Sequence, residues 1–118
     1  MQIDIQSRHF TLTEALRGYI KRRLGFALGS RDEHIRRVRV RLSDVNGPKG
    51  GDDKCCHVQV TLEHLPDIVI KDTEADLYRA IDRAADRADR TLGRRLARQR
   101  TRGRSTAMRP QLTTAEIL

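Results

Sequence analysis

The stretch Cys55-Cys56-His57 is the first place where this sequence suggests chemistry, because thiolates and imidazoles are preferred ligands of zinc. The residues around it alternate between polar and apolar types, which predicts a β-strand over residues 55–62. On a strand, Cys55 and Cys56 point to opposite faces and cannot easily share an ion. No histidine stands in HxxH or HExxH spacing. We therefore expect Cys56 to be a small core residue, and we expect no metal site and no cofactor.

Three carboxylates, Asp82, Asp86 and Asp89, could form a cluster for acid–base catalysis. Arginines of the same predicted helix lie three or four residues away, and Asp86 with Arg90 has the favourable four-residue spacing. We interpret these aspartates as ion-pair partners of arginines on their own helix. The sequence also lacks a nucleophile elbow, a P-loop and a glycine-rich dinucleotide turn. We expect no catalytic residues, no enzyme and no small-molecule substrate.

Arginines recur through residues 73–98 at a spacing that places them on one side of an α-helix, opposite an apolar stripe. The apolar stripe predicts a buried face made of Leu77, Ile81, Ala84, Ala85, Ala88, Leu92 and Leu96. The opposite stripe comprises Arg79, Arg83, Arg87, Arg90, Arg94 and Arg98. Because this stripe faces away from the core, reversing Arg83, Arg87 and Arg90 to Glu is expected to leave thermal stability nearly unchanged.

The positive charge of the chain is concentrated near its C-terminal end. Residues 87–109 hold nine arginines and one aspartate, a net charge of +8, whereas the rest of the chain holds 15 basic and 15 acidic residues. The arginine stripe alone is consistent with a solvated helix face, but the unbalanced run favours a polyanionic partner. With two phenylalanines, two tyrosines and no tryptophan, the chain has few side chains for base stacking. We expect contacts to sugar and phosphate instead.

Apolar periodicity predicts the elements that position these residues. Strands are expected over residues 2–8, 35–42, 55–62 and 68–71, and helices over about 13–28 and 73–98. Thr11 or Thr13 is the expected N-cap of the first helix. The order β-α-β-β-β-α predicts an α+β two-layer sandwich, in which a four-stranded mixed sheet carries both helices on one face. On the second strand, Arg37, Arg39 and Arg41 are expected to point outward.

The 118 residues suffice for one domain, which we place at residues 1–98, followed by a basic and flexible tail at 99–118. Residues 43–54 are rich in Gly, Pro and Asp and are expected to form a mobile hairpin loop. Gly93 is expected to bend or fray the second helix. The sequence has neither a long apolar segment nor a signal peptide, so we expect a cytoplasmic protein that does not bind membranes.

Several short motifs resemble the ribosome hibernation factors, which include the hibernation-promoting factors, the ribosome-associated inhibitor and the sigma-54 modulation proteins. The resemblance is sharpest at residues 76–82, where Asp-Leu-Tyr-x-Ala-Ile-Asp stands, and Ser7-Arg8 and Thr13-x-Ala15-Leu16-Arg17 add to it. It covers about residues 1–98. Only some twenty residues follow, so the chain is similar to a short form that lacks a C-terminal dimerisation domain.

This resemblance implies a double-stranded-RNA-binding-domain-like α+β fold and a specific partner. It implies that the protein binds 16S rRNA of the small ribosomal subunit, in the channel for mRNA and tRNA, and silences idle ribosomes under stress or in stationary phase. The positions that match basic residues of the family are Arg8, Arg17, Arg23, Arg87, Arg90, Arg94 and Arg98. To these RNA-binding candidates the helical periodicity adds Arg79 and Arg83, and the basic cluster of the first helix adds Lys21 and Arg22.

Two other kinds of binding protein are compatible with the sequence. A general double-stranded RNA or DNA-binding domain would use the same cationic face and would bind any duplex with similar affinity. A protein-binding transcription regulator would keep its partner after nuclease treatment and would be less sensitive to salt.

Overall fold

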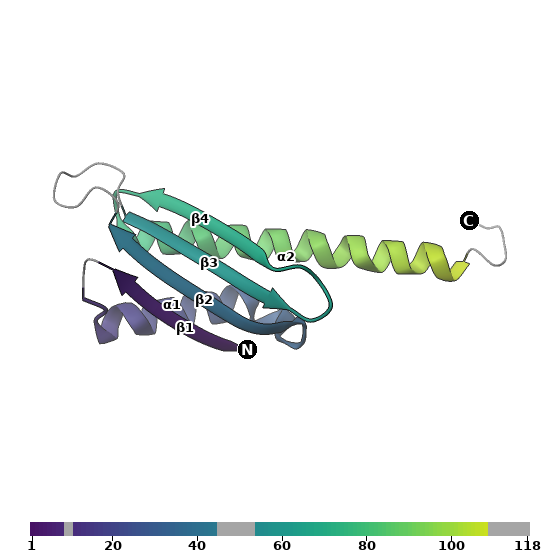
Figure 1. The fold of residues 1–118 in the computed structure, drawn as a ribbon, viewed down its shortest axis with the longest axis horizontal. Helices are drawn as coiled ribbons and strands as arrows, with labels where there is room; N and C mark the ends of the chain where they lie inside the picture. The colour runs from purple at the N-terminus through teal and green to yellow at the C-terminus, as the bar shows by residue number, and fades with distance from the viewer. Residues whose placement is uncertain (9–10, 45–53, 109–118) are drawn as a thin grey trace.

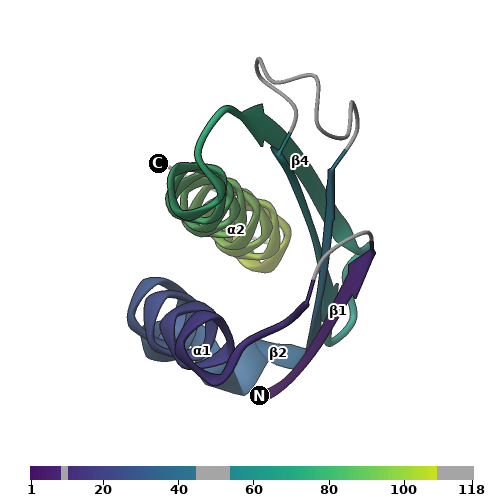
Figure 2. The same ribbon diagram turned by 90° about the vertical axis from the view of Figure 1, so that its left-hand side faces the viewer.

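The computed structural model of the 118-residue chain describes residues 1–8, 11–44 and 54–108, with side chains through residue 100. One layer is a four-stranded sheet, and the two helices form the other layer on one face of that sheet (Figures 1 and 2). The elements in chain order are β1 (Gln2–Arg8), α1 (Glu14–Leu28), the 3-10 helix η1 (Gly29–His34), β2 (Ile35–Asp44), β3 (Lys54–Leu62), β4 (Ile68–Glu74) and α2 (Leu77–Met108).

The strands lie in the order β1-β2-β3-β4. β1 is parallel to β2, with Ile5 beside Val40. Helix α1 makes this possible because it returns the chain to the end of the sheet at which β1 begins. β2, β3 and β4 follow as an antiparallel meander. The predicted α+β sandwich with a mixed sheet is therefore confirmed, and Figure 2 shows both helices on the same side.

The core lies between the sheet and the helices. On α2, the predicted apolar stripe is buried from Ile81 to Leu96, with Leu77 half-buried at its start. Val38, Val40 and Leu42 of β2 point into the same core, as their alternation predicts. Cys56 is also a core residue, as expected, and burial raises the pKa of its thiol to about 12.

The boundaries of two elements differ from the prediction in a way that affects the function. Thr13 caps α1 as expected, since its hydroxyl oxygen accepts from the Leu16 amide at 3.1 Å. β4, however, continues to Glu74 instead of ending at Lys71, and α2 begins at Leu77 instead of Thr73. Asp76 starts the helix by accepting from the Tyr78 amide at 3.1 Å. The extra length of β4 adds two carboxylates, Asp72 and Glu74, to the sheet.

Helix α2 runs without interruption through Gly93 to Met108, so the fraying expected at this glycine does not occur. Its C-terminal part extends well beyond the sheet (Figure 1). The domain boundary proposed at residue 98 stays a prediction, and residues 109–118 of the expected tail lie outside the described residues, as do residues 45–53 of the expected hairpin loop. No helix in the described part of the chain has the length and apolarity needed to cross a membrane.

Candidate nucleic-acid interface

The first half of the α2 arginine stripe is paired with carboxylates of β4. Arg79 lies 3.5 Å from Glu74, and Arg83 lies 3.1 Å from Glu74 and 3.8 Å from Asp72. Arg87 Nη1 lies 3.0 Å from Asp72 Oδ2 and also donates to the Lys71 carbonyl at 3.0 Å. These three arginines therefore have counterions within the protein.

Asp72 is the buried partner of this group, with 8% of its surface exposed. Its Oδ2 atom receives no well-directed hydrogen bond from any described residue. The negative charge of Asp72 is therefore balanced by the nearby guanidinium groups of Arg87 and Arg83. A buried carboxylate without a nearby cation costs free energy, so moving these two arginines away from Asp72 would destabilise the fold.

The aspartates of α2 pair with arginines of other elements, which corrects the prediction of partners on the same helix. Arg23 of α1 lies 3.2 Å from Asp82 and 2.6 Å from Asp86. Tyr19 donates its hydroxyl to Asp82, which raises the pKa of Tyr19. The hydrogen bond to Asp86 likewise raises the pKa of Arg23. No ion pair joins Asp86 to Arg90 within the described residues.

Arg31 of η1 makes a second connection to α2, through an ion pair with Asp89. To reach Asp89, the Arg31 side chain passes over Gly93, where an added Cβ would lie 2.9 Å from Arg31 Nη2. Gly93 is thus a place where a side chain from a neighbouring element lies against the helix backbone. A second arginine, Arg95, donates to the carbonyls of Pro66 and Asp67 in the β3–β4 turn, at 2.6 and 3.3 Å.

The second half of the stripe has no such partners. Arg90, Arg94 and Arg98 are exposed, and none forms an ion pair or hydrogen bond with another described residue. They lie on the part of α2 that approaches and passes the end of the sheet (Figure 1). Since their charges are not neutralised internally, they are available to an anionic ligand.

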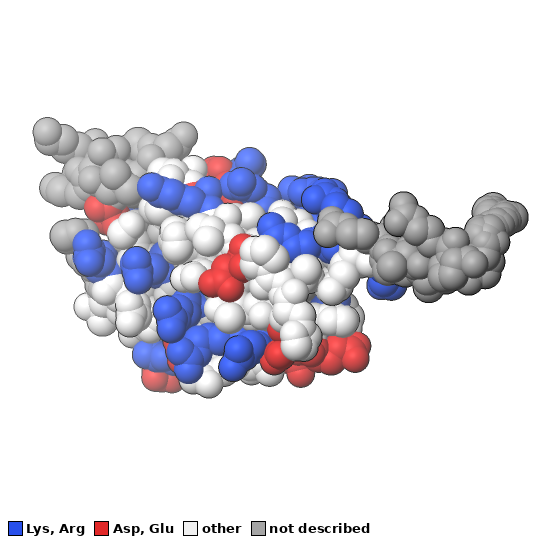
Figure 3. Space-filling view, turned by 45° about the vertical axis from the view of Figure 1, so that its right-hand side comes forward, with Lys and Arg blue, Asp and Glu red and all other residues white. Residues whose placement is uncertain are grey.

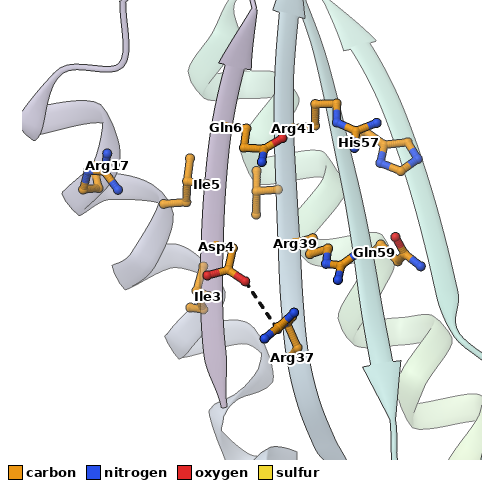
Figure 4. A pocket seen from close by; sticks show the side chains of 11 residues that line it. Ile3, Asp4, Ile5, Gln6, Arg17, Arg37, Arg39, Arg41, His57 and Gln59 are labelled. Atoms are coloured by element: carbon orange, nitrogen blue, oxygen red, sulfur yellow. Dashed lines mark ion pairs between the residues drawn. The ribbon is translucent and has the colours of Figure 1, made fainter.

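The remaining candidates lie on α1 and at the end of β1. Arg17 is half-buried beside Ile5 of β1 (Figure 4), whereas Lys21 and Arg22 are exposed, with the Arg22 guanidinium lying over Gly18. Arg23 is turned toward α2, and only 22% of its side chain is exposed. Arg8 stands at the end of β1, at an outward position of the sheet.

The structure therefore does not assemble all predicted residues into one surface. Arg90, Arg94 and Arg98 form a connected exposed group on α2, which we call the distal arginines. Arg79, Arg83 and Arg87, the proximal arginines, are paired with β4. Sequence reasoning missed this pairing because it ended β4 too early: residues 71–74 are all polar, so the sequence shows no alternation of polar and apolar types that would extend the strand.

The described side chains include no group of three His, Cys, Asp or Glu residues arranged to hold a metal ion. Cys55 and Cys56 are both buried, and of the two only Cys56 belongs to the core cluster. Guanidinium groups on a rigid helix can position phosphates without reading base sequence.

Comparisons with known proteins agree with this fold. Residues 3–100 match the family described as Sigma 54 modulation protein / S30EA ribosomal protein, a match that includes all four strands, α1 and most of α2. The comparison with curated proteins gives no match.

Two solved structures are similar to this one. The first is the N-terminal domain of Protein Y from Thermus thermophilus, with 29% identity and a TM-score of 0.67, over 80% of this chain and 98% of that chain. The second is a ribosomal subunit interface protein from Coxiella burnetii, with 18% identity and a TM-score of 0.70, over 82% of this chain and 99% of that one. The second likeness, at this low identity, concerns the fold alone.

Proposed function

This chain belongs to the Sigma 54 modulation protein / S30EA ribosomal protein family of ribosome hibernation factors, and from that premise we propose that it binds the small ribosomal subunit and silences idle ribosomes. The family match over residues 3–100 is the observation that carries the proposal. We infer a cytoplasmic protein that acts under stress or in stationary phase, when many ribosomes are idle.

The proposed binding site is the backbone of 16S rRNA in the channel that otherwise holds mRNA and tRNA. The distal arginines support this proposal, because they are exposed cations without partners in the described structure. Lys21 and Arg22 add exposed positive charge on α1. Guanidinium groups form bidentate, charge-assisted hydrogen bonds with phosphates, which suits a ligand recognised by its backbone.

The proposed mechanism is occlusion. A folded cationic domain that fills the channel excludes mRNA and the tRNA anticodon arms, and it needs no chemical step. The proximal arginines contribute less to this binding, because each would have to leave a carboxylate of β4 to contact a phosphate. Phosphate contacts release counterions, so the affinity should fall steeply as salt rises.

Co-sedimentation tests the proposal. Purified protein is mixed with separated small and large subunits at about 50 to 300 mM salt, with and without excess duplex RNA. We expect retention on small subunits despite the duplex, with loss of binding as salt increases. In the variant Arg90→Glu/Arg94→Glu/Arg98→Glu, we expect binding to be lost while the circular dichroism spectrum and melting temperature are preserved.

Two results would contradict the proposal. Equal binding to both subunits, or release by duplex RNA, would indicate a general duplex-binding domain. Binding that persists after nuclease treatment and at high salt would indicate a protein partner instead.

A further inference from the structure

The face of the sheet that points away from the helices is a second basic surface. Along β2, buried Val38, Val40 and Leu42 alternate with Arg37, Arg39 and Arg41, which point outward as their positions in the sequence predict. Figure 4 shows these three arginines on one side of the sheet, next to Gln59 and His57 of β3. None of them belongs to the candidate RNA-binding set on the helices.

The strand register arranges this surface in rows. Gln6 of β1 lies beside Arg41 of β2, Arg41 lies beside His57 of β3, and His57 lies beside Lys71 of β4. Adjacent strands are about 4.8 Å apart, so the row from Arg41 to Lys71 spans roughly 10 Å. In the next row, Arg39 lies between Asp4 and Gln59. Together with Arg8 at the end of β1, these residues form what we call the outer basic face.

The charges on this face are poorly neutralised. Among the outward positions of the described strands, the one carboxylate is Asp4, which lies 3.3 Å from Arg37. Arg39, Arg41 and Lys71 are exposed and form no ion pair with a described residue. Figure 3 shows Lys and Arg side chains over this side of the molecule, with Asp and Glu side chains among them. Asp67, just before β4, accepts a hydrogen bond from Gln59 at 2.8 Å. The proximal arginines of α2, by contrast, are matched to Asp72 and Glu74.

The composition of the outer basic face selects one kind of ligand. At its described outward positions it has no Phe, Tyr or Trp, so base stacking there is limited to the His57 ring and the guanidinium planes. It offers guanidinium and ammonium groups together with the donors of Gln6 and His57, all of which suit phosphate oxygens and ribose hydroxyls. A surface required only for solubility gains more from charges of both signs than from one sign.

We propose that the outer basic face binds a second segment of rRNA backbone, on the side of the domain opposite the helices. This inference rests on the proposed function and extends it: the domain is held between two RNA segments, one on the distal arginines and one on Arg39, Arg41 and Lys71. A wedge with cationic surfaces on both sides fits a channel lined by RNA better than one with a single binding face.

Neutralising the face tests this proposal. The variant Arg39→Gln/Arg41→Gln/Lys71→Gln should fold normally, because all three side chains are exposed and unpaired within the described structure. Its affinity for small subunits should fall about tenfold or more at ~100 mM salt, with a shallower dependence of binding on salt. The matched single variants are Arg41→Gln, which should weaken binding, and Arg36→Gln on the same strand, which should not. Arg36 is exposed and pairs with Glu63, outside the rows described above.

The outcomes separate the two proposals. If the triple variant binds small subunits as tightly as the wild type, while the distal-arginine variant loses binding, the outer basic face is only a solvated surface and the proposed function stands. If the wild-type protein shows no preference for small subunits, the proposed function is contradicted, and so is this inference, which rests on it.

A tethered cleavage reagent locates the RNA directly. Both native cysteines are buried, at 3% and 1% exposure, so an introduced cysteine can be labelled selectively. A probe at Gln59→Cys reports on the outer basic face, and a probe at exposed Ala15→Cys reports on α1. We expect both probes to cleave 16S rRNA in bound small subunits, at different positions. Cleavage from the α1 probe with none from the sheet probe would overturn the inference.

Discussion

The two halves of the α2 arginine stripe have the same residue type and the same helical spacing but different surroundings. The proximal half faces Asp72 and Glu74, which are among the last residues of β4. The distal half continues toward and past the end of the sheet, where it forms no ion pair with a described carboxylate. The first half is therefore held by ion pairs within the fold, and we propose that the second half provides charge for a ligand.

This difference shows that a count of arginines does not measure the charge that a ligand meets. Asp72 is largely buried and depends on Arg87 and Arg83, so these arginines have a structural role that helical periodicity alone does not reveal. The four predictions below test this division, beginning with the largest expected effect.

Reversing the proximal pair, Arg83→Glu/Arg87→Glu, should destabilise the protein by roughly 2 to 3 kcal/mol, because two new carboxylates would face Asp72 and Glu74. The structure thus changes the expectation, based on the sequence, that such reversals leave stability unaffected. Urea unfolding followed by circular dichroism measures the effect.

The matched control for this reversal is Arg90→Glu/Arg94→Glu, which makes the same charge change on the same helix. Because both residues are exposed and unpaired with described residues, its free energy of unfolding should stay within about 0.5 kcal/mol of the wild type. Equal stability of the two variants would remove the distinction between the halves.

Asp72→Asn should remove the ion pairs of this residue with Arg83 and Arg87 while keeping the shape of the side chain. Arg83 keeps Glu74 as a partner, at 3.1 Å. The loss of the ion pairs should reduce the free energy of unfolding by about 1 to 2 kcal/mol, less than the double reversal does. At the same time, non-specific affinity for RNA should increase and its salt dependence should steepen, since Arg83 and Arg87 would lose a counterion. Filter binding to a duplex RNA measures this gain, and an unchanged salt slope would contradict it.

Local patterns predicted the fold well because each element carries its own signal. The alternation of β2 and the apolar stripe of α2 specify which faces are buried, and the β-α-β-β-β-α order then leaves few ways to pair the strands. The outward direction of Arg37, Arg39 and Arg41 follows from the same alternation.

The pairing of the charges could not be predicted in this way, because it depends on contacts between distant segments. Arg23 meets Asp86 across 63 residues of sequence, and Arg31 meets Asp89 across 58. Spacing on one helix suggested Arg90 as the partner of Asp86, yet α1 packs close enough to supply a better-placed guanidinium. Which candidate residues contact RNA stays a prediction for the same reason: the answer depends on a partner's surface.

Gly93→Ala tests how closely Arg31 lies against α2. Alanine favours a helix by about 1 kcal/mol over glycine, but its Cβ would displace the Arg31 guanidinium and weaken the pair with Asp89. We expect a net stabilisation of less than about 0.5 kcal/mol. In an Arg31→Ala background, the same change should give the full gain of about 1 kcal/mol. Equal effects in both backgrounds would show that Arg31 does not cover Gly93 in solution.

The smallest effect concerns Tyr19, on the side of α2 that faces α1. Its hydroxyl donates to Asp82, and this hydrogen bond raises the pKa of Tyr19 above the ordinary value of 10.0. Because the folded state holds the proton more tightly, the stabilisation is complete below about pH 10 and is lost as pH rises through the higher pKa of the folded protein.

With Tyr78→Phe, Tyr19 is the one tyrosine left, so the ultraviolet absorbance of tyrosinate reports on it alone. The midpoint should lie above 10.0 and should fall when Asp82→Asn is added. A midpoint that does not respond to Asp82→Asn would mean that the aspartates of α2 are not held by α1, and the division between structural and ligand-binding charges on this helix would have to be drawn again.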